Sequence, residues 1–529
     1  MRDAFIHKGI VVLLWLIGLQ VHAAPTHTLT VALQEEPTAI DPHYQSFTPN
    51  MQLAATLFDP LVRKNSQSVP VPALAQSWQV DGDTWTFNLR QGVRFSDGSF
   101  LTAADVLYSY ERVYKIRNSP SSYALYLSQV KAVKAIDDYT VQIITDGPAP
   151  VLLENLAMIP ILSQRAATQD SHSESLSQLI NHKSLAGTGP YQLEHWHRGT
   201  ELAVVRNPYY WDEAPAWDRV VFKLLPDGQQ RVEALVTGAV DMIESPPVAE
   251  ITRLQSMPAI FIQQVPSTRL LYISLNQDQA VPEGMAGTLG KNPLRDQRVR
   301  AALSLAIDRE ALVQTVMSGV AQAAGNLLSY PAFGAGERFA LAPLLDVAKA
   351  RQLLKEAGYA QGFKLSLGAP VGRYRNDEQI AQAIATMWGQ IGIEVEVELF
   401  TPALFFKQRD QYAFSSYLSG WSVMTGEMSN PLIALAMTPD PSLGYGITNW
   451  SHYSNHQLDQ LIVQAMHTLD VDQRAILLEQ ASTMLMVDYG LLPILFEMST
   501  WAMKQSIRYD GRADQFTLPQ HIYPLEPPT

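Results

Sequence analysis

Short segments in the first half of the chain alternate apolar and polar residues, the pattern of a strand with one buried face. The clearest is 85–90, in which Trp85, Phe87 and Leu89 alternate with polar residues. Other segments of this kind are 29–33, 138–143, 202–206 and 220–224. These segments predict that the first half of the protein is built largely on β-sheet.

Beyond residue 290 the apolar positions recur with the helical period instead. Five apolar residues between 299 and 307 fall at i, i+3, i+4, i+7 and i+8, and Asp308 is placed to cap the next helix. Further helices are expected at 346–358, 377–391, 458–466 and 475–485, with a strand at 393–399. Helices and strands in alternation predict an α/β lobe with crossover connections.

An apolar strand at 491–496 follows this second set of elements. We expect it to return to the first lobe, so the chain crosses between two lobes twice, near 268–275 and near 496–501. A length of 529 residues is ample for two or three domains.

The segment 95–106 predicts a tight turn followed at once by a helix. Asp97 and Gly98 form a turn dipeptide. Thr102 is placed to cap the helix, and Asp105, three residues later, can reach back to the Thr102 backbone as in a capping box. These residues are expected to be scaffold rather than ligand contacts.

The N-terminus predicts export. Arg2 and Lys8 precede an apolar run of ten residues, and Val21 and Ala23 supply small residues at a cleavage site. Because a bilayer span needs about 20 residues, 1–23 is interpreted as a signal peptide. The chain has no cysteine for a disulfide or a lipid anchor. A soluble periplasmic protein is expected.

Composition and motifs argue against several function classes. The net charge of −13 disfavours nucleic acid or an anionic membrane as partner. The chain has no Gly-x-Ser-x-Gly, His-Glu-x-x-His or Gly-x-x-x-x-Gly-Lys motif and no cysteine nucleophile. We therefore expect no enzyme, and an exported hydrolase is the alternative from another class.

The spacing nearest to a metal motif is that of His195 and His197, which share one face of a predicted strand. They stand next to Glu194 in a segment of exposed type, where two solvated histidines are the more common outcome. No metal site and no cofactor are expected.

Two segments at strand ends carry candidate binding residues. Arg373 follows the strand segment 363–367 and can hold a carboxylate with two guanidinium donors, or belong to a solvated charge run. Trp421 follows the strand-like run 414–418 in a glycine-containing segment. It can line a cleft or pack in the core equally well.

Several motifs resemble, in their order, the hallmarks of one family. They are 95–106, 187–191, 207–211, 298–309 and 353–359. From about residue 29 to residue 523 the chain is similar to the bacterial extracellular solute-binding proteins of family 5. These are the dipeptide-, oligopeptide- and nickel-type periplasmic binding proteins of ABC importers.

The resemblance implies an α/β periplasmic binding protein fold with two lobes, a ligand cleft between them and an extra subdomain in the first lobe. The boundaries expected are 24–270 for lobe I, with 65–185 as the extra subdomain, 271–495 for lobe II, and 496–529 for the return and tail. A monomer is expected that captures its solute by lobe closure and delivers it to an inner-membrane permease with ATPase subunits.

The resemblance also implies site residues. Arg373, with Tyr374 beside it, matches the arginine that holds the peptide carboxylate in dipeptide-binding members. The aspartate that binds the amino group in those members corresponds to Met424, whereas Glu427 takes its place when the loop is counted back from Pro431.

Three further residues complete the expected site. Trp421 adjoins the Glu427 loop, and Tyr44 and Gln45, in the loop after the first strand, would face the cleft from the other lobe. The segment 420–427 is also similar to the glutathione-binding branch. Dipeptides, tripeptides and glutathione therefore remain open as ligands, and a nickel complex or another non-peptide solute is the alternative if Arg373 and Glu427 do not face one cavity.

Overall fold

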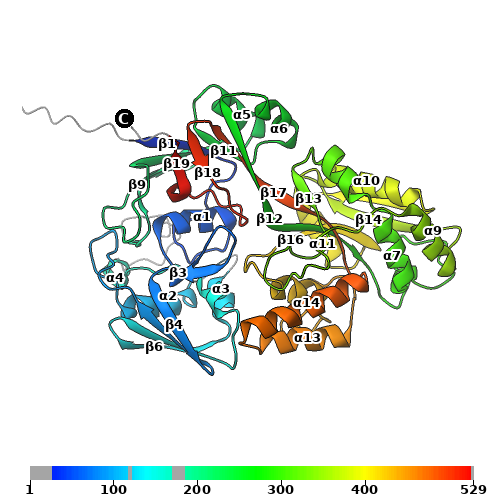
Figure 1. The fold of residues 1–529 in the computed structure, drawn as a ribbon, viewed down its shortest axis with the longest axis horizontal. Coiled ribbons are helices and arrows are strands. Elements are labelled where there is room, and N and C mark those ends of the chain that lie inside the picture. Colours follow the sequence, from blue (N-terminus) through cyan, green and yellow to red (C-terminus); the bar gives the residue numbers. More distant parts are fainter. Residues whose placement is uncertain (1–26, 117–118, 120–121, 170–184, 442, 526–529) are drawn as a thin grey trace, which may run out of the picture.

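The computed structural model describes residues 27–116, 119, 122–169, 185–441 and 443–525. The predicted signal peptide and the last four residues lie outside this range. The described elements form two α/β lobes joined by two long strands, β12 (Ile260–Leu275) and β17 (Leu492–Lys504), which Figure 1 shows running between the lobes.

One eleven-stranded sheet extends through both lobes, in the order β15-β14-β16-β12-β17-β11-β1-β10-β9-β8, with β13 (Ala321–Ala323) paired to β17. The lobe I strands are β1 (Thr28–Leu33), β8 (Tyr191–His197), β9 (Glu201–Arg206), β10 (Arg219–Leu224) and β11 (Met242–Glu244). The lobe II strands are β14 (Lys364–Pro370), β15 (Glu394–Phe400) and β16 (Ser416–Ser422).

The two crossing strands are paired to each other and anchored at opposite ends. Their antiparallel register runs from the Ile260–Lys504 pair to the Ile273–Leu492 pair, with an irregularity between Pro266 and Leu270. In lobe II β12 pairs with β16, and in lobe I β17 pairs with β11. The expected two crossings are confirmed.

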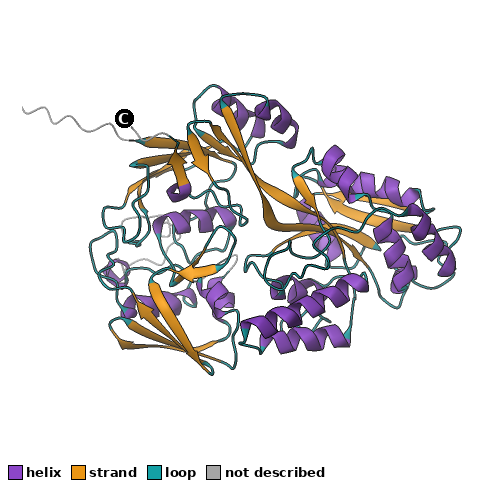
Figure 2. Cartoon of the chain, viewed as in Figure 1, coloured by secondary structure: helices purple, strands orange, loops and turns teal. Residues whose placement is uncertain are grey.

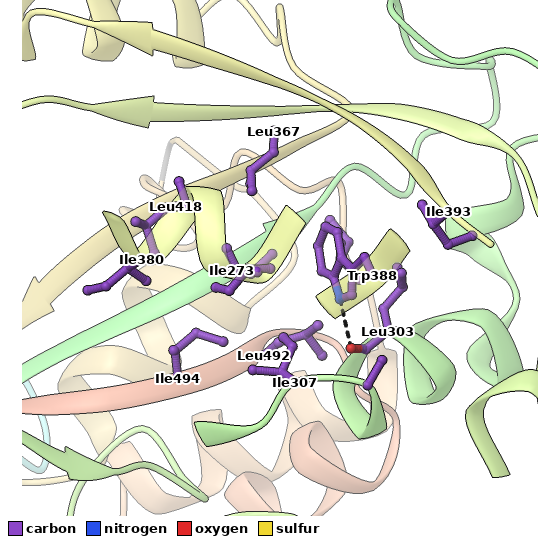
Figure 3. Packing of buried hydrophobic residues seen from close by; sticks show 14 of the residues in the cluster. Ile273, Leu303, Ile307, Leu367, Ile380, Trp388, Ile393, Leu418, Leu492 and Ile494 are labelled. Carbon is purple, nitrogen blue, oxygen red and sulfur yellow. Dashed lines mark hydrogen bonds between the residues drawn. The ribbon is translucent and has the colours of Figure 1, made fainter. Parts of the chain in front are cut away.

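The largest hydrophobic cluster lies in lobe II, where helices pack on the sheet (Figure 3). The apolar stripe of α7 (Gln297–Leu305) meets α10 (Asp377–Gly389). Trp388 of α10 is fully buried, and its indole N–H donates to the Leu303 carbonyl over 2.9 Å. α9 (Val347–Glu356) begins at the expected position, where the Asp346 side chain accepts from the Lys349 N–H.

Lobe I carries a second, four-stranded sheet in the order β4-β5-β7-β6. Its strands are β4 (Ala75–Asp81), β5 (Thr84–Leu89), β6 (Val130–Asp137) and β7 (Thr140–Thr145). The helix α2 (Ala103–Val113) covers it (Figure 2), and the capping box forms as expected, with the Thr102 N–H donating to Asp105 over 2.9 Å. Gly98 has φ +83°, as the turn requires.

Two elements of this region reach toward lobe II: the hairpin of β2 (Val62–Lys64) and β3 (Pro70–Pro72), and the short helix α3 (Leu152–Leu156). The other helices are α1 (Thr48–Leu57), α4 (Gln164–Gln169), α5 (Gly228–Val236), α6 (Val248–Gln255), α8 (Arg309–Ala311), α11 (Pro402–Arg409), α12 (Ser429–Pro431), α13 (His456–Met466) and α14 (Val471–Val487). A final hairpin joins β18 (Ile507–Tyr509) and β19 (Ile522–Pro524). Among the described helices none has the length and apolar character that a membrane crossing requires.

Candidate functional site

In both lobes the carboxyl ends of strands, and the loops that follow them, lie near the place where β12 and β17 cross between the lobes. This place is called the junction. β14 and β16 are parallel, and β16 runs antiparallel to β12, so both carboxyl ends lie where β12 enters lobe II. β1 and β11 are likewise parallel, and β11 runs antiparallel to β17, which places their carboxyl ends on the lobe I side. Ligands of α/β sheets collect at such ends.

The lobes touch through the β2–β3 hairpin and the loop after β16. The Lys64 ammonium donates to the Met424 carbonyl over 2.5 Å. Gly426 approaches Ser68 so closely that a Cβ built on the glycine would lie 2.6 Å from the Ser68 Cβ, and its φ is +78°. Glycine is required here both for its conformation and for this close approach.

Charged side chains from both lobes are buried beside this contact. Burial, together with the nearby Glu427 carboxylate, raises the pKa of Glu154 on α3 to about 7. Burial also lowers the pKa of Lys64 to about 8. Because Glu154 belongs to lobe I and Glu427 to lobe II, the electrostatics of this contact depend on how closely the lobes approach.

Arg373 lies in the loop at the carboxyl end of β14 with an exposed side chain. Its guanidinium carbon is 5.6 Å from the centre of the Tyr374 ring. The Asp377 carboxylate fixes the loop, because it accepts from the backbone N–H groups of Gly372, Arg373 and Tyr374 over 2.9–3.1 Å. The guanidinium of Arg373 is thus presented on a rigid loop at the junction.

Tyr374 has a packing role. Its side chain is buried in the lobe II cluster, and its ring occupies the space left by Gly420, where a Cβ would come within 2.7 Å of the ring. The expected contact between Tyr374 and ligand would therefore require the ring to leave this position.

Trp421 lies at the end of β16, between core and junction. It is half-buried, packs against the second lobe II cluster, and donates its indole N–H to the Asn430 side chain over 2.9 Å.

Glu427 follows Trp421 by six residues of irregular loop and lies in a different environment. Its carboxylate is 3% exposed and forms an ion pair with Arg474 of α14, while the Ser429 hydroxyl donates to it. A ligand ammonium would have to displace Arg474 to use this carboxylate.

Tyr44 and Gln45 lie in the loop between β1 and α1, and their described contacts stay within lobe I. The Tyr44 carbonyl accepts from the Ser119 hydroxyl over 2.6 Å, and the Gln45 side chain accepts from the Thr38 hydroxyl over 3.1 Å. The described contacts therefore do not bring Tyr44 or Gln45 together with Arg373 or Glu427.

Sequence reasoning missed a charged cluster at the crossing strands. Glu497 of β17 is 5% exposed; one carboxylate oxygen accepts from the Arg375 backbone N–H over 3.1 Å, and the other lies 3.7 Å from Arg269 Nε. Arg375 also donates to the Met498 carbonyl over 3.2 Å. Burial lowers the pKa of Arg375, and the like charge of Arg269 adds to this effect.

The Glu497 carboxylate thus serves the Arg269 guanidinium and the Arg375 backbone N–H, and with the Arg375 guanidinium nearby the cluster holds two positive charges against one negative charge. Arg269 Nε and the nearby Ser499 hydroxyl are buried without a hydrogen-bond partner among the described residues. Buried donors of this kind ordinarily find an acceptor. The available signal was Glu497 itself, a lone charge directly after the apolar segment 491–496.

A cavity of about 280 Å³ is lined mostly by lobe I residues, and Lys64 and Met424 are both part of its lining. Two ion pairs line it: Arg63 with Asp212 at 2.6 Å, and Arg512 with Asp514 at 2.5 Å. Arg373 and Trp421 do not belong to its described lining.

Comparison with known proteins places these features in context. Residues 69–440 match the model of the bacterial extracellular solute-binding proteins, family 5. The chain is 27% identical over 496 residues to the dipeptide-binding protein of Escherichia coli K12, with 89% of each chain covered. It is also 27% identical over 480 residues to the glutathione-binding protein of the same strain, again with 89% of each covered.

The fold has a solved counterpart as well. The structure of HbpA2 from Haemophilus parasuis superposes with a TM-score of 0.82 at 24% identity, covering 94% of this chain and 99% of that one. This likeness confirms the expected two-lobed α/β fold.

Proposed function

Because the chain belongs to the bacterial extracellular solute-binding proteins of family 5, we propose that it captures short peptides between its lobes and delivers them to an ABC permease. Its family consists of binding proteins, so the chain is a binding protein rather than an enzyme. Beyond membership of this family, we propose the class of ligand, the residues that hold it, and its delivery from the periplasm.

The observation that carries the proposal is the surplus of hydrogen-bond donors and positive charge at the crossing strands. Glu497 forms an ion pair with Arg269 and accepts from the Arg375 backbone N–H, and the buried Arg269 Nε and Ser499 hydroxyl have no hydrogen-bond partner among the described residues. A peptide supplies carbonyl oxygens and a terminal carboxylate, which match such donors. The exposed Arg373 guanidinium, two residues before Arg375, is the proposed anchor of that carboxylate.

The amino end of the peptide is less simply accommodated. Met424, at the position of the aspartate in dipeptide-binding members, provides no charge, and Glu427 already neutralises Arg474. In the proposed site Glu427 meets the ammonium only if the ion pair with Arg474 rearranges. Peptides whose amino end is held by backbone carbonyls or water therefore fit this site best.

Lobe closure couples ligand binding to recognition by the permease. A ligand that contacts both lobes stabilises the closed arrangement relative to the open one, and this difference lets a permease distinguish loaded from empty protein. The contacts from Lys64 to Met424 and from Ser68 to Gly426 are the proposed closed-state contacts.

A thermal-shift screen tests the ligand class. The purified protein is titrated with dipeptides, tripeptides, glutathione, a nickel–histidine complex and haem. A peptide at 100 times its Kd should stabilise the protein by about 2.7 kcal/mol. A shift with the nickel complex or haem alone would contradict the peptide proposal.

A further inference from the structure

The hairpin of β8 and β9 gathers three metal-binding side chains on its exposed face. His195 and His197 alternate along β8, and Glu201 of β9 pairs directly with His197. His195 Nε2 lies 3.0 Å from Glu201 Oε1, and His197 Nδ1 lies 4.0 Å from the same oxygen. One donor atom from each residue lies within 4.8 Å of the other two.

These separations suit a shared metal ion. Zinc binds imidazole nitrogen and carboxylate oxygen at about 2.0–2.2 Å, so tetrahedral ligand atoms stand roughly 3.4 Å apart. Donor atoms that lie up to 4.8 Å apart need side-chain adjustments of up to about 1.4 Å to reach this spacing. Two imidazoles and one carboxylate are a donor set for Zn²⁺ and its borderline neighbours rather than for Mg²⁺ or Ca²⁺.

A second layer of contacts orients His195. Its other ring nitrogen, Nδ1, lies 3.4 Å from a Glu194 oxygen, and that oxygen accepts from Arg219 Nε over 2.8 Å. A register shift between Leu193 and His195 accompanies this arrangement. A carboxylate behind the ligating histidine is the usual outer partner at protein metal sites, where it fixes the ring orientation.

The opposite face of the hairpin is anchored to lobe I. The Trp196 indole N–H donates to Glu36 over 2.8 Å, and the Gly199 N–H in the turn donates to the same carboxylate over 3.0 Å. The backbone that carries the three donors is therefore held in place while their face stays open to solvent, with His197 67% exposed.

We propose that His195, His197 and Glu201 form a surface site for a divalent transition-metal ion of the Zn²⁺ class, with water completing the coordination. The sequence favoured two solvated histidines because they stand beside Glu194 in a segment of exposed type; the third donor, Glu201, comes from the paired strand. The site lies on lobe I, away from the loops that carry Arg373 and Trp421, and does not depend on the peptide proposal.

Isothermal titration with ZnCl₂ tests the site, using chelator-treated protein prepared without a histidine tag. We expect one saturable site, weakened at least tenfold by His197→Ala and by Glu201→Gln. His456→Ala, at an exposed histidine on α13, is the matched control and should leave zinc binding unchanged. Mg²⁺ at the same concentration should produce no saturable heat.

Because His197 is exposed, its variant should melt at the wild-type temperature without metal, and Zn²⁺ should raise the melting midpoint of the wild type but not of the variant. Absence of saturable zinc binding to the wild type would overturn the proposal. Equal loss of binding in His197→Ala and His456→Ala would overturn it as well.

Discussion

Replacing Glu427 by glutamine separates a structural role for this residue from a ligand-binding one. Glu427 and Arg474 are 3% and 5% exposed, and Arg474 Nε has no described hydrogen-bond partner. Removing the carboxylate leaves a buried cation without its counter-charge, which costs about 3–5 kcal/mol. For a lobe of this size the melting midpoint should fall by roughly 6–20 °C.

The charge of Glu154 affects where in this range the loss of stability should fall. Loss of the Glu427 charge relieves the repulsion felt by Glu154, so the lower half of the range is expected. Thermal unfolding followed by circular dichroism measures the effect. The matched control is Glu111→Gln, which breaks an exposed i,i+4 pair with Lys115 and should cost about 0.3–0.5 kcal/mol.

The double variant Glu427→Gln/Arg474→Met removes both charges and should recover most of the lost stability. If Glu427→Gln instead melts like the Glu111→Gln control while peptide affinity collapses, the ion pair is not structural. Glu427 would then be a ligand residue, and its ion pair with Arg474 would not stabilise the fold.

Three other substitutions probe the core and the contact between the lobes. Trp388→Ala should cost about 3–5 kcal/mol in urea unfolding, since it empties a fully buried site; a loss below about 1 kcal/mol would contradict the packing. Gly426→Ala should hinder closure by its clash with Ser68, so small-angle scattering should show a larger radius of gyration at saturating ligand. Gly444→Ala, a positive-φ glycine in open space, is the control and should close normally. Lowering the pH from above 7 toward 4.5 should shift the equilibrium between open and closed lobes toward the closed form. The raised pKa of Glu154 means that its carboxylate takes up a proton more readily in the closed form than in the open one. The charged groups that face Glu154 are Lys64, Glu427 and Arg474. Glu154→Gln should flatten the dependence of closure on pH between 4.5 and 7, and an unchanged dependence would exclude Glu154 as the titrating group.

Local signals in the sequence predicted much of the scaffold. The capping box at Thr102 and Asp105, the cap at Asp308 and the helix that contains Trp388 depend on residues within a few positions of one another. The crossings were predicted, but β12 was expected to be shorter because polar residues such as Gln263 and Gln264 interrupt its apolar pattern.

The candidate site could be predicted less completely, because it depends on partners distant in sequence. Arg474, which neutralises Glu427, lies 47 residues away, and Met424 meets Lys64 across 360 residues. Nothing local to Glu427 indicates that its carboxylate is already paired. Likewise, Glu201 joins the two histidines only through the pairing of β8 with β9.

The central claim, capture of a peptide through its carboxylate, is tested most directly by comparing a peptide with its C-terminal amide. Titration calorimetry should give at least tenfold weaker binding for the amide. Arg373→Ala should reduce peptide affinity to the level of the amide, whereas Arg253→Ala, at an exposed arginine on α6, should leave both affinities unchanged. Equal affinity of peptide and amide for the wild-type protein would contradict the account.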